Sequence, residues 1–278
     1  MIDSHHHLWH HSAEEYPWIP AGTALAQNQL LPELESACRA AGVDATVVVQ
    51  ARQSLDESDW LLSLAEKSDL IRGVVGWVPL TNPDVGHALA RLSSHPKFKA
   101  VRHVLQAEPD EYFLRADFHH GLALLPAYGL HYDLLLFQRQ LPTAIQLVDR
   151  QAQLGIIVNH LAKPEIHKGK IDPAWKSGMA ELAKRDNILG VKISGLVTEV
   201  RDAQLDEATL SAYFDEALAL FGPDRLLFGS DWPVCLLRID SYQNWAESVR
   251  NFIHKLSPDE QQAILHDNAA RCYNLSFP

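Results

Sequence analysis

Short apolar runs rich in β-branched residues recur along this chain about every 25 to 35 residues, with amphipathic stretches of helical period between them. This alternation is typical of repeated β-then-α units, whose strands lie parallel in one sheet. Strands are expected at residues 1–5, 45–51, 73–78, 100–105, 131–137, 155–159, 189–194 and 225–230. Helices are expected at 31–41, 57–68, 83–93, 143–153, 173–185, 206–221, 241–256 and 258–273, and a loop at 106–127.

Eight such runs in 278 residues fit one α/β domain, a single (β/α)8 TIM barrel over residues 1–278. In such a barrel the active site lies at the C-terminal ends of the strands. A doubly wound open sheet is the rival architecture. It is disfavoured because no Gly-x-Gly-x-x-Gly follows the first strand, and because polar residues follow several different strands.

The chain has 24 Lys and Arg against 35 Asp and Glu, a formal net charge of −11. This balance argues against nucleic acid and anionic membrane surfaces as partners, so a small molecule is expected. The three cysteines are widely spaced and form no C-x-x-C pair, which suits a reducing cytoplasm. We expect no signal peptide and no membrane span, and the sequence leaves the oligomeric state open.

The segment IDSHHH at residues 2–7 ends the first expected strand. Side chains at i and i+2 of a strand share a face, so His5 and His7 should converge on one point. That arrangement suits a metal ion or a polarised oxygen. A purification tag would also give adjacent histidines, but a tag would have no partners far downstream in the sequence.

Polar residues also follow the later strands at the same end of the expected barrel. They are Arg102 and His103, Gln138 and Arg139, Asn159, His160 and Lys163, Lys192 and Ser194, and Ser230 and Asp231. Asp231 follows the apolar run at 226–228 after only two residues, and carboxylates are almost never buried without a partner. It should therefore face the barrel mouth.

These motifs, in this order, resemble the amidohydrolase superfamily, and within it the sugar-lactonase branch of L-fuconolactonase, L-rhamnonolactonase and pyrone-dicarboxylate lactonase. The similarity rests on DSHHHLW at 3–9, VRHVLQ at 101–106, VNHLAKP at 158–164, LFGSDWP at 227–233 and NAARCY at 268–273. It runs from the start of the chain to residue 273. The resemblance implies hydrolysis of a sugar-acid lactone at the barrel mouth.

In that reading Asp231 is the general base that activates water and later returns the proton to the leaving ring oxygen. His5, His7 and His160 polarise the lactone carbonyl, either directly or through a divalent ion. One zinc ion held by His5, His7 and Asp231 is possible, but we expect it not to be strictly required. The fourth and fifth strands lack the additional Lys or His ligand that many metal-dependent relatives carry.

The remaining candidates are interpreted as substrate-binding residues. Arg102 could clamp a carboxylate or hydroxyl groups, and its neighbour His103 should point to the other face of the strand. Lys163 and Lys192 could each bind substrate or support the pocket. Trp9 and Trp232 could form a stacking wall for a sugar ring, although ordinary core packing explains them almost as well.

Two alternatives stay open at this stage. One is a metal-dependent decarboxylase of an unsaturated acid on the same barrel, which a complete metal-ligand set would favour. The other is a non-catalytic barrel that only binds a metabolite, against which stands the retention of both histidines of the first strand together with Asp231. No Gly-x-Ser-x-Gly elbow is present, so a serine hydrolase is not expected.

Overall fold

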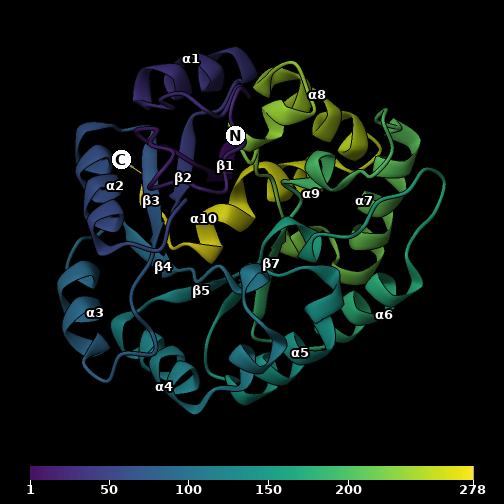
Figure 1. Cartoon of the computed structure of the whole chain (residues 1–278). Helices are drawn as coiled ribbons and strands as arrows, with labels where there is room; N and C mark the ends of the chain where they lie inside the picture. Colours follow the sequence, from purple (N-terminus) through teal and green to yellow (C-terminus); the bar gives the residue numbers. More distant parts are fainter. Residues whose placement is uncertain (278) are drawn as a thin grey trace.

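Eight parallel strands form the centre of the computed structural model, which describes residues 1–277 (Figure 1). Neighbouring strands follow the chain order from β1 to β8. The strands are β1 (Ile2–His6), β2 (Ala45–Val49), β3 (Ile71–Gly76), β4 (Phe98–Val101), β5 (His131–Leu134), β6 (Ile156–Val158), β7 (Ile188–Lys192) and β8 (Leu226–Leu227).

Helices surround this sheet as an outer ring (Figure 1). They are α1 (Leu31–Ala41), α2 (Leu55–Lys67), α3 (Val85–Ser93), α4 (Ala116–Leu124), α5 (Leu141–Arg150), α6 (Pro173–Leu182), α7 (Glu207–Phe221) and α8 (Tyr242–Ile253). Two short helices follow, α9 (Pro258–Gln262) and α10 (Asn268–Cys272), and α10 lies over the middle of the barrel in the view of Figure 1. The main apolar core lies between strands and helices. In the described residues no helix has the length and apolar character to cross a bilayer.

The sheet is nearly closed into a barrel where its last strand meets its first. The Ser4 amide donates to the Phe228 carbonyl at 3.0 Å, and the His7 amide donates to the Trp232 carbonyl at 2.7 Å. His6 and Trp232 form a parallel bridge just beyond β8. The expected (β/α)8 barrel is therefore confirmed, and the two ends of the chain meet along one seam.

Several expected boundaries were wrong. Residues 106–127, expected to be a loop, contain α4, a short helix that contributes Phe118 and Leu122 to the core. The helix expected at 258–273 is broken by a π-turn at Ala263–Asp267. Most strands end one to four residues earlier than expected.

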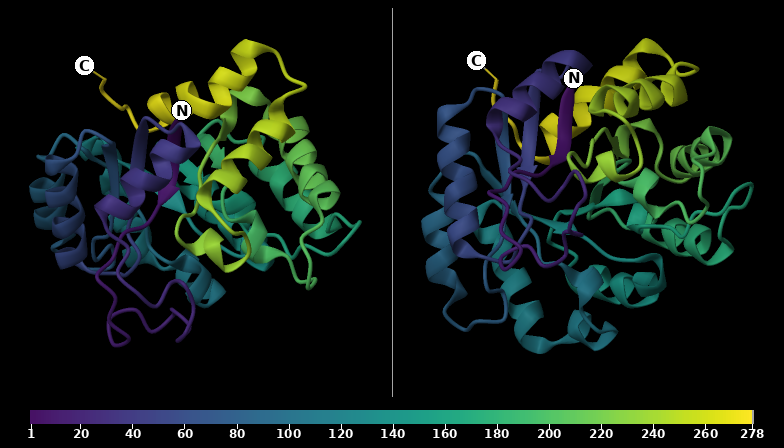
Figure 2. Two further views of the ribbon diagram at one scale, coloured as in Figure 1. Left: turned by 90° about the horizontal axis from the view of Figure 1, so that it is seen from above. Right: turned by 45° about the horizontal axis from the view of Figure 1, so that its top comes forward.

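The barrel has two different ends (Figure 2). The last helix and both termini lie at one end, and the loop over residues 10–28 projects at the other. Inward-facing strand residues at alternate positions, such as Ala45, Val47 and Val49, pack with Tyr273 in one interior cluster. The loop end is where the C-terminal ends of the strands open, so the polar residues that follow the strands gather there.

Candidate active site

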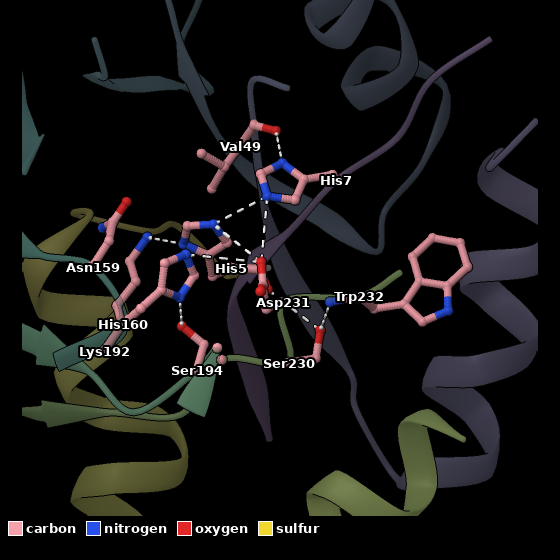
Figure 3. A network of polar contacts seen from close by, with 12 residues as sticks. His5, His7, Val49, Asn159, His160, Lys192, Ser194, Ser230, Asp231 and Trp232 are labelled. Atoms are coloured by element: carbon pink, nitrogen blue, oxygen red, sulfur yellow. Dashed lines mark hydrogen bonds and ion pairs between the residues drawn. The ribbon is translucent and has the colours of Figure 1, made fainter. Parts of the chain in front are cut away.

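His5, His7 and Asp231 meet at the seam between the first and last strands (Figure 3). His5 Nε2 lies 3.3 Å from His7 Nε2, so the two imidazoles do converge. The Asp231 carboxylate lies 3.5 Å from His7 Nε2 and 3.8 Å from His5 Nε2. Its backbone amide donates to the His5 carbonyl at 2.8 Å, which fixes the aspartate beside the histidines.

Asp3 ties the two sides of this seam together. Its buried carboxylate accepts from the amide and hydroxyl of Ser230 at 2.9 and 2.6 Å, and from the Tyr242 hydroxyl at 2.7 Å. It also accepts from the His5 amide at 2.9 Å. Asp3 therefore positions the backbone on both sides of the histidine and aspartate, although its side chain does not reach the mouth itself.

His160 joins the cluster from the end of β6. Its Nε2 lies 3.8 Å from the Asp231 carboxylate, and its Nδ1 lies 2.9 Å from the Ser194 hydroxyl. The backbone there is left-handed at four successive non-glycine residues, with φ between 47° and 58° from His160 to Lys163, and Asp231 has φ 57°. Such residues cost roughly 1–2 kcal/mol each, so the fold holds both groups in place against local strain.

Burial sets the charge states in the cluster. It lowers the pKa of His160 to about 3 and lowers the pKa of His5 and His7 below the ordinary histidine value. Burial alone raises the pKa of Asp231, but His160, His7 and Lys163 more than offset this, and the net pKa is lowered. At neutral pH the site therefore presents one carboxylate among neutral imidazoles.

The cluster has the composition of a divalent metal site. Among the described residues, one ligand atom each from His5, His160 and Asp231 lie within 4.8 Å of one another, so His160 stands in this set where His7 was expected. The Nδ1–H of His7 donates to the Val49 carbonyl at 2.7 Å, and the Ser194 hydroxyl can accept from His160 Nδ1. Such partners leave Nε2 of His7 and of His160 unprotonated and free to bind an ion, so these residues fit a metal.

Arg102 faces the cluster, and His103 does not. Arg102 Nη1 lies 3.3 Å from His5 Nε2 and 3.4 Å from Asn159 Oδ1, and Nη2 donates to the backbone and side-chain oxygens of Gln50. Its guanidinium is buried, and among residues 1–277 it has no ion pair with a carboxylate, which suits an oxygen-rich or anionic ligand. Of these two neighbours, Arg102 is therefore the one that lies toward the histidines.

His103 instead packs outside the barrel interior. Its Nδ1 accepts from the Trp77 indole at 3.3 Å, its Nε2 is 2.9 Å from Glu108, and its ring stacks on Tyr112 with centroids 4.9 Å apart. Both ring nitrogens therefore have protein partners. The side chain holds the loop after β4 in place.

The two lysines occupy different positions. Lys163 lies at the rim, 3.0 Å from Glu199, and its ammonium sits 5.2 Å from the centroid of the Phe137 ring. Lys192 is fully buried inside the barrel and pairs with Asp133 at 2.6 Å. Asp133 was not singled out from the sequence, although a carboxylate between Tyr132 and Leu134 in an apolar strand is the same signal that drew attention to Lys192.

The two tryptophans expected to form a stacking wall lie differently. Trp9 is 0% exposed, its ring centroid lies 6.4 Å from that of His7, and its indole donates to the Gln27 carbonyl at 3.0 Å. Trp232 points away from the histidines toward a neighbouring helix (Figure 3). Trp18, not considered from the sequence, is 44% exposed, packs edge-on against Trp9, and donates to the Ala51 carbonyl at the end of β2.

The turn after β2 depends on a buried carboxylate that the sequence analysis also missed. Glu57 of α2 accepts from the amides of Ala51 and Arg52 at 3.0 and 2.9 Å, and from the Tyr16 hydroxyl at 3.1 Å. This turn follows Gln50, which holds Arg102. Glu57 thus fixes both the 10–28 loop and the segment that orients the buried guanidinium.

A barrel that gathers histidines from β1 and β6 and an aspartate after β8 has the design of the amidohydrolases. An amidohydrolase family model matches residues 2–275, and the chain belongs to this family. It is 38% identical over 291 residues to the L-fucono-1,5-lactonase of Burkholderia multivorans, covering 100% of this chain and 97% of that protein.

Two further relatives agree with this assignment. The L-fucono-1,5-lactonase of Burkholderia ambifaria is 31% identical, covering 100% of this chain and 96% of that protein. A crystal structure of an amidohydrolase from Burkholderia multivorans with bound zinc is 38% identical, with a TM-score of 0.94 and 99% coverage of both chains. The resemblance expected from the sequence motifs is confirmed.

Proposed function

We propose that this protein hydrolyses the lactone of a sugar acid, an aldono-1,4- or 1,5-lactone of a deoxy or simple sugar. The observation that carries this proposal is the Asp231 carboxylate held within 3.8 Å of nitrogens of His5, His7 and His160 at the barrel mouth. The full-length relatives named L-fucono-1,5-lactonase support the substrate class. L-fucono-1,5-lactone is therefore the first compound to test.

Asp231 acts as the general base. Its lowered pKa keeps it ionised at neutral pH, so it can accept a proton from a water molecule. The water oxygen bonds to the lactone carbonyl carbon and forms a tetrahedral intermediate. The bond from that carbon to the ring oxygen then breaks, Asp231 returns the proton to this oxygen, and the product is an open-chain hydroxy acid.

Negative charge develops on the carbonyl oxygen during this attack. The Arg102 guanidinium and the His5 ring face the same space, and preorganised donors such as this guanidinium lower the barrier by stabilising that charge. A divalent ion held by His5, His160 and Asp231, with His7 beside them, would supply the same polarisation and lower the pKa of a bound water. We propose that such an ion can bind but is not strictly required.

The decarboxylase alternative has less support. It calls for a complete metal centre with a further ligand from the fifth strand. β5 contributes Asp133 to the barrel interior, and that carboxylate pairs with Lys192 at 2.6 Å and accepts from Tyr273 at 2.8 Å. A binding protein without catalysis has no need for a strained backbone at both His160 and Asp231.

The test is hydrolysis of a panel of aldonolactones followed by acid release with a pH indicator. We expect turnover by the wild type and a loss of about 10²–10⁴-fold in kcat for Asp231→Asn. Asp149→Asn, on the outer surface at the end of α5, is the matched control and should retain wild-type turnover. Wild-type turnover by Asp231→Asn would refute the mechanism, and inactivity of the wild type on the whole panel would refute the substrate class.

A further inference from the structure

The C-terminal motif NAARCY, to which the proposed reaction assigns no role, contributes a tyrosine to the barrel interior. Tyr273 directly follows α10 and is 0% exposed. It enters the barrel from the end opposite to the mouth, and it packs in the interior cluster with Ile2, Val47 and Leu227. Its hydroxyl lies 2.8 Å from one oxygen of Asp133 and 3.1 Å from the other.

Asp133 is the point at which several buried groups meet. Besides the Tyr273 hydroxyl it accepts from Lys192 Nζ at 2.6 Å and from Asn159 Nδ2 at 3.0 Å. A buried carboxylate is tolerated when it is paired and hydrogen-bonded, and Asp133 is both. Each of its partners is thereby held in one orientation.

Lys192 connects this centre to the active site, because its Nζ also lies 3.2 Å from His5 Nδ1 (Figure 3). An ammonium group has donors and no acceptor, so Lys192 can hydrogen-bond Nδ1 only as a donor. This contact holds one edge of the His5 ring.

Two further groups contact the other nitrogen of the same ring. Arg102 Nη1 lies 3.3 Å from His5 Nε2. His7, which donates through Nδ1 to the Val49 carbonyl, has its Nε2 3.3 Å from His5 Nε2. The His5 ring is therefore held between Lys192 at Nδ1 and Arg102 and His7 at Nε2.

We infer that Tyr273 is a positioning residue of the reaction, acting through Asp133 and Lys192 to hold His5 with its Nε2 directed at the mouth. The inference rests on the proposed lactone hydrolysis, in which His5 polarises the lactone carbonyl, either directly or through an ion. Removal of the Tyr273 hydroxyl frees Asp133 to rotate. Lys192 and His5 then lose their fixed orientation without any change at a group that touches the substrate.

Tyr273→Phe tests this inference, because it removes only the hydroxyl group. We expect kcat to fall about tenfold with KM within about twofold, as for other groups that orient a catalytic side chain. Tyr213→Phe is the matched control. Its buried hydroxyl also makes two hydrogen bonds, since it accepts from the Asp172 amide and donates to the Glu165 carbonyl, but it lies outside the barrel interior. The control should lower the melting temperature by a similar amount and leave kcat unchanged. Equal kcat values for the two variants would overturn the inference.

A second measurement does not depend on the reaction. Nitrogen NMR of ¹⁵N-histidine-labelled protein, with the His5 signals assigned by their loss in His5→Asn, reports the surroundings of both ring nitrogens. We expect the His5 signals to shift in Tyr273→Phe and to keep their wild-type positions in Tyr213→Phe. His5 signals that are unchanged in Tyr273→Phe would overturn the inference. Absence of lactone turnover together with the expected NMR result would refute the proposed function alone.

Discussion

Glu57 carries a prediction about how stability depends on pH. The carboxyl group is 1% exposed, and burial raises its pKa from 4.5 to about 7 despite hydrogen bonds from Arg52, Tyr16 and Ala51. Below pH 4.5 the group is protonated in both the folded and the unfolded states. As the pH rises toward 7, Glu57 ionises first in the unfolded state, so the free energy of unfolding falls.

The size of this loss follows from the two pKa values. A difference between 4.5 and about 7 corresponds to about 3 kcal/mol, reached once the pH exceeds the folded-state value. Glu57→Gln should not show this loss of stability, because the side-chain amide does not ionise. The amide oxygen can accept from the amides of Ala51 and Arg52, and the amide nitrogen can donate to the Tyr16 hydroxyl, as the protonated acid does.

The assay is urea denaturation of both proteins between pH 4.5 and pH 8. We expect similar unfolding free energies at pH 4.5, and at pH 8 we expect Glu57→Gln to be more stable than the wild type by up to about 3 kcal/mol. Glu14→Gln in the same loop region is the control, since Glu14 is exposed and its replacement should give no pH-dependent difference. A Glu57→Gln variant that is less stable than the wild type at pH 8 would refute the reasoning.

Three further predictions concern the site. Gly195→Ala should lower kcat at least about tenfold, because its Cβ would lie 2.5 Å from His160 Nδ1. Gly22→Ala has a similar positive φ with nothing within 4 Å, so it should lower stability but leave kcat unchanged. Lys192→Met should lower the urea unfolding free energy by about 3–5 kcal/mol, because it leaves Asp133 buried without its cation. Dialysis against a chelator should leave most of the lactonase turnover, and complete loss that zinc restores would contradict this.

The local pattern of the sequence was enough to predict the barrel and the meeting of His5 with His7. Strand period decides which side chains share a face, and it is written in adjacent residues. The polar residues at strand ends could be identified in the same way, since parallel strands place all their C-terminal ends at one mouth. The helix at 116–124 escaped prediction because its apolar residues lie on more than one side and its hydrophobic pattern is weak.

Contacts between distant strands could not be predicted in this way. The sequence shows a charge inside the fifth strand and another inside the seventh, but the pairing of Asp133 with Lys192, and of both with Tyr273 from the chain's end, depends on the stagger of a closed sheet. The same holds for Trp9, whose burial is decided by the loop that folds over it. Sequence periodicity determined which face each side chain occupies, whereas barrel closure alone decided what it meets there, because the partners are separated by many residues of chain.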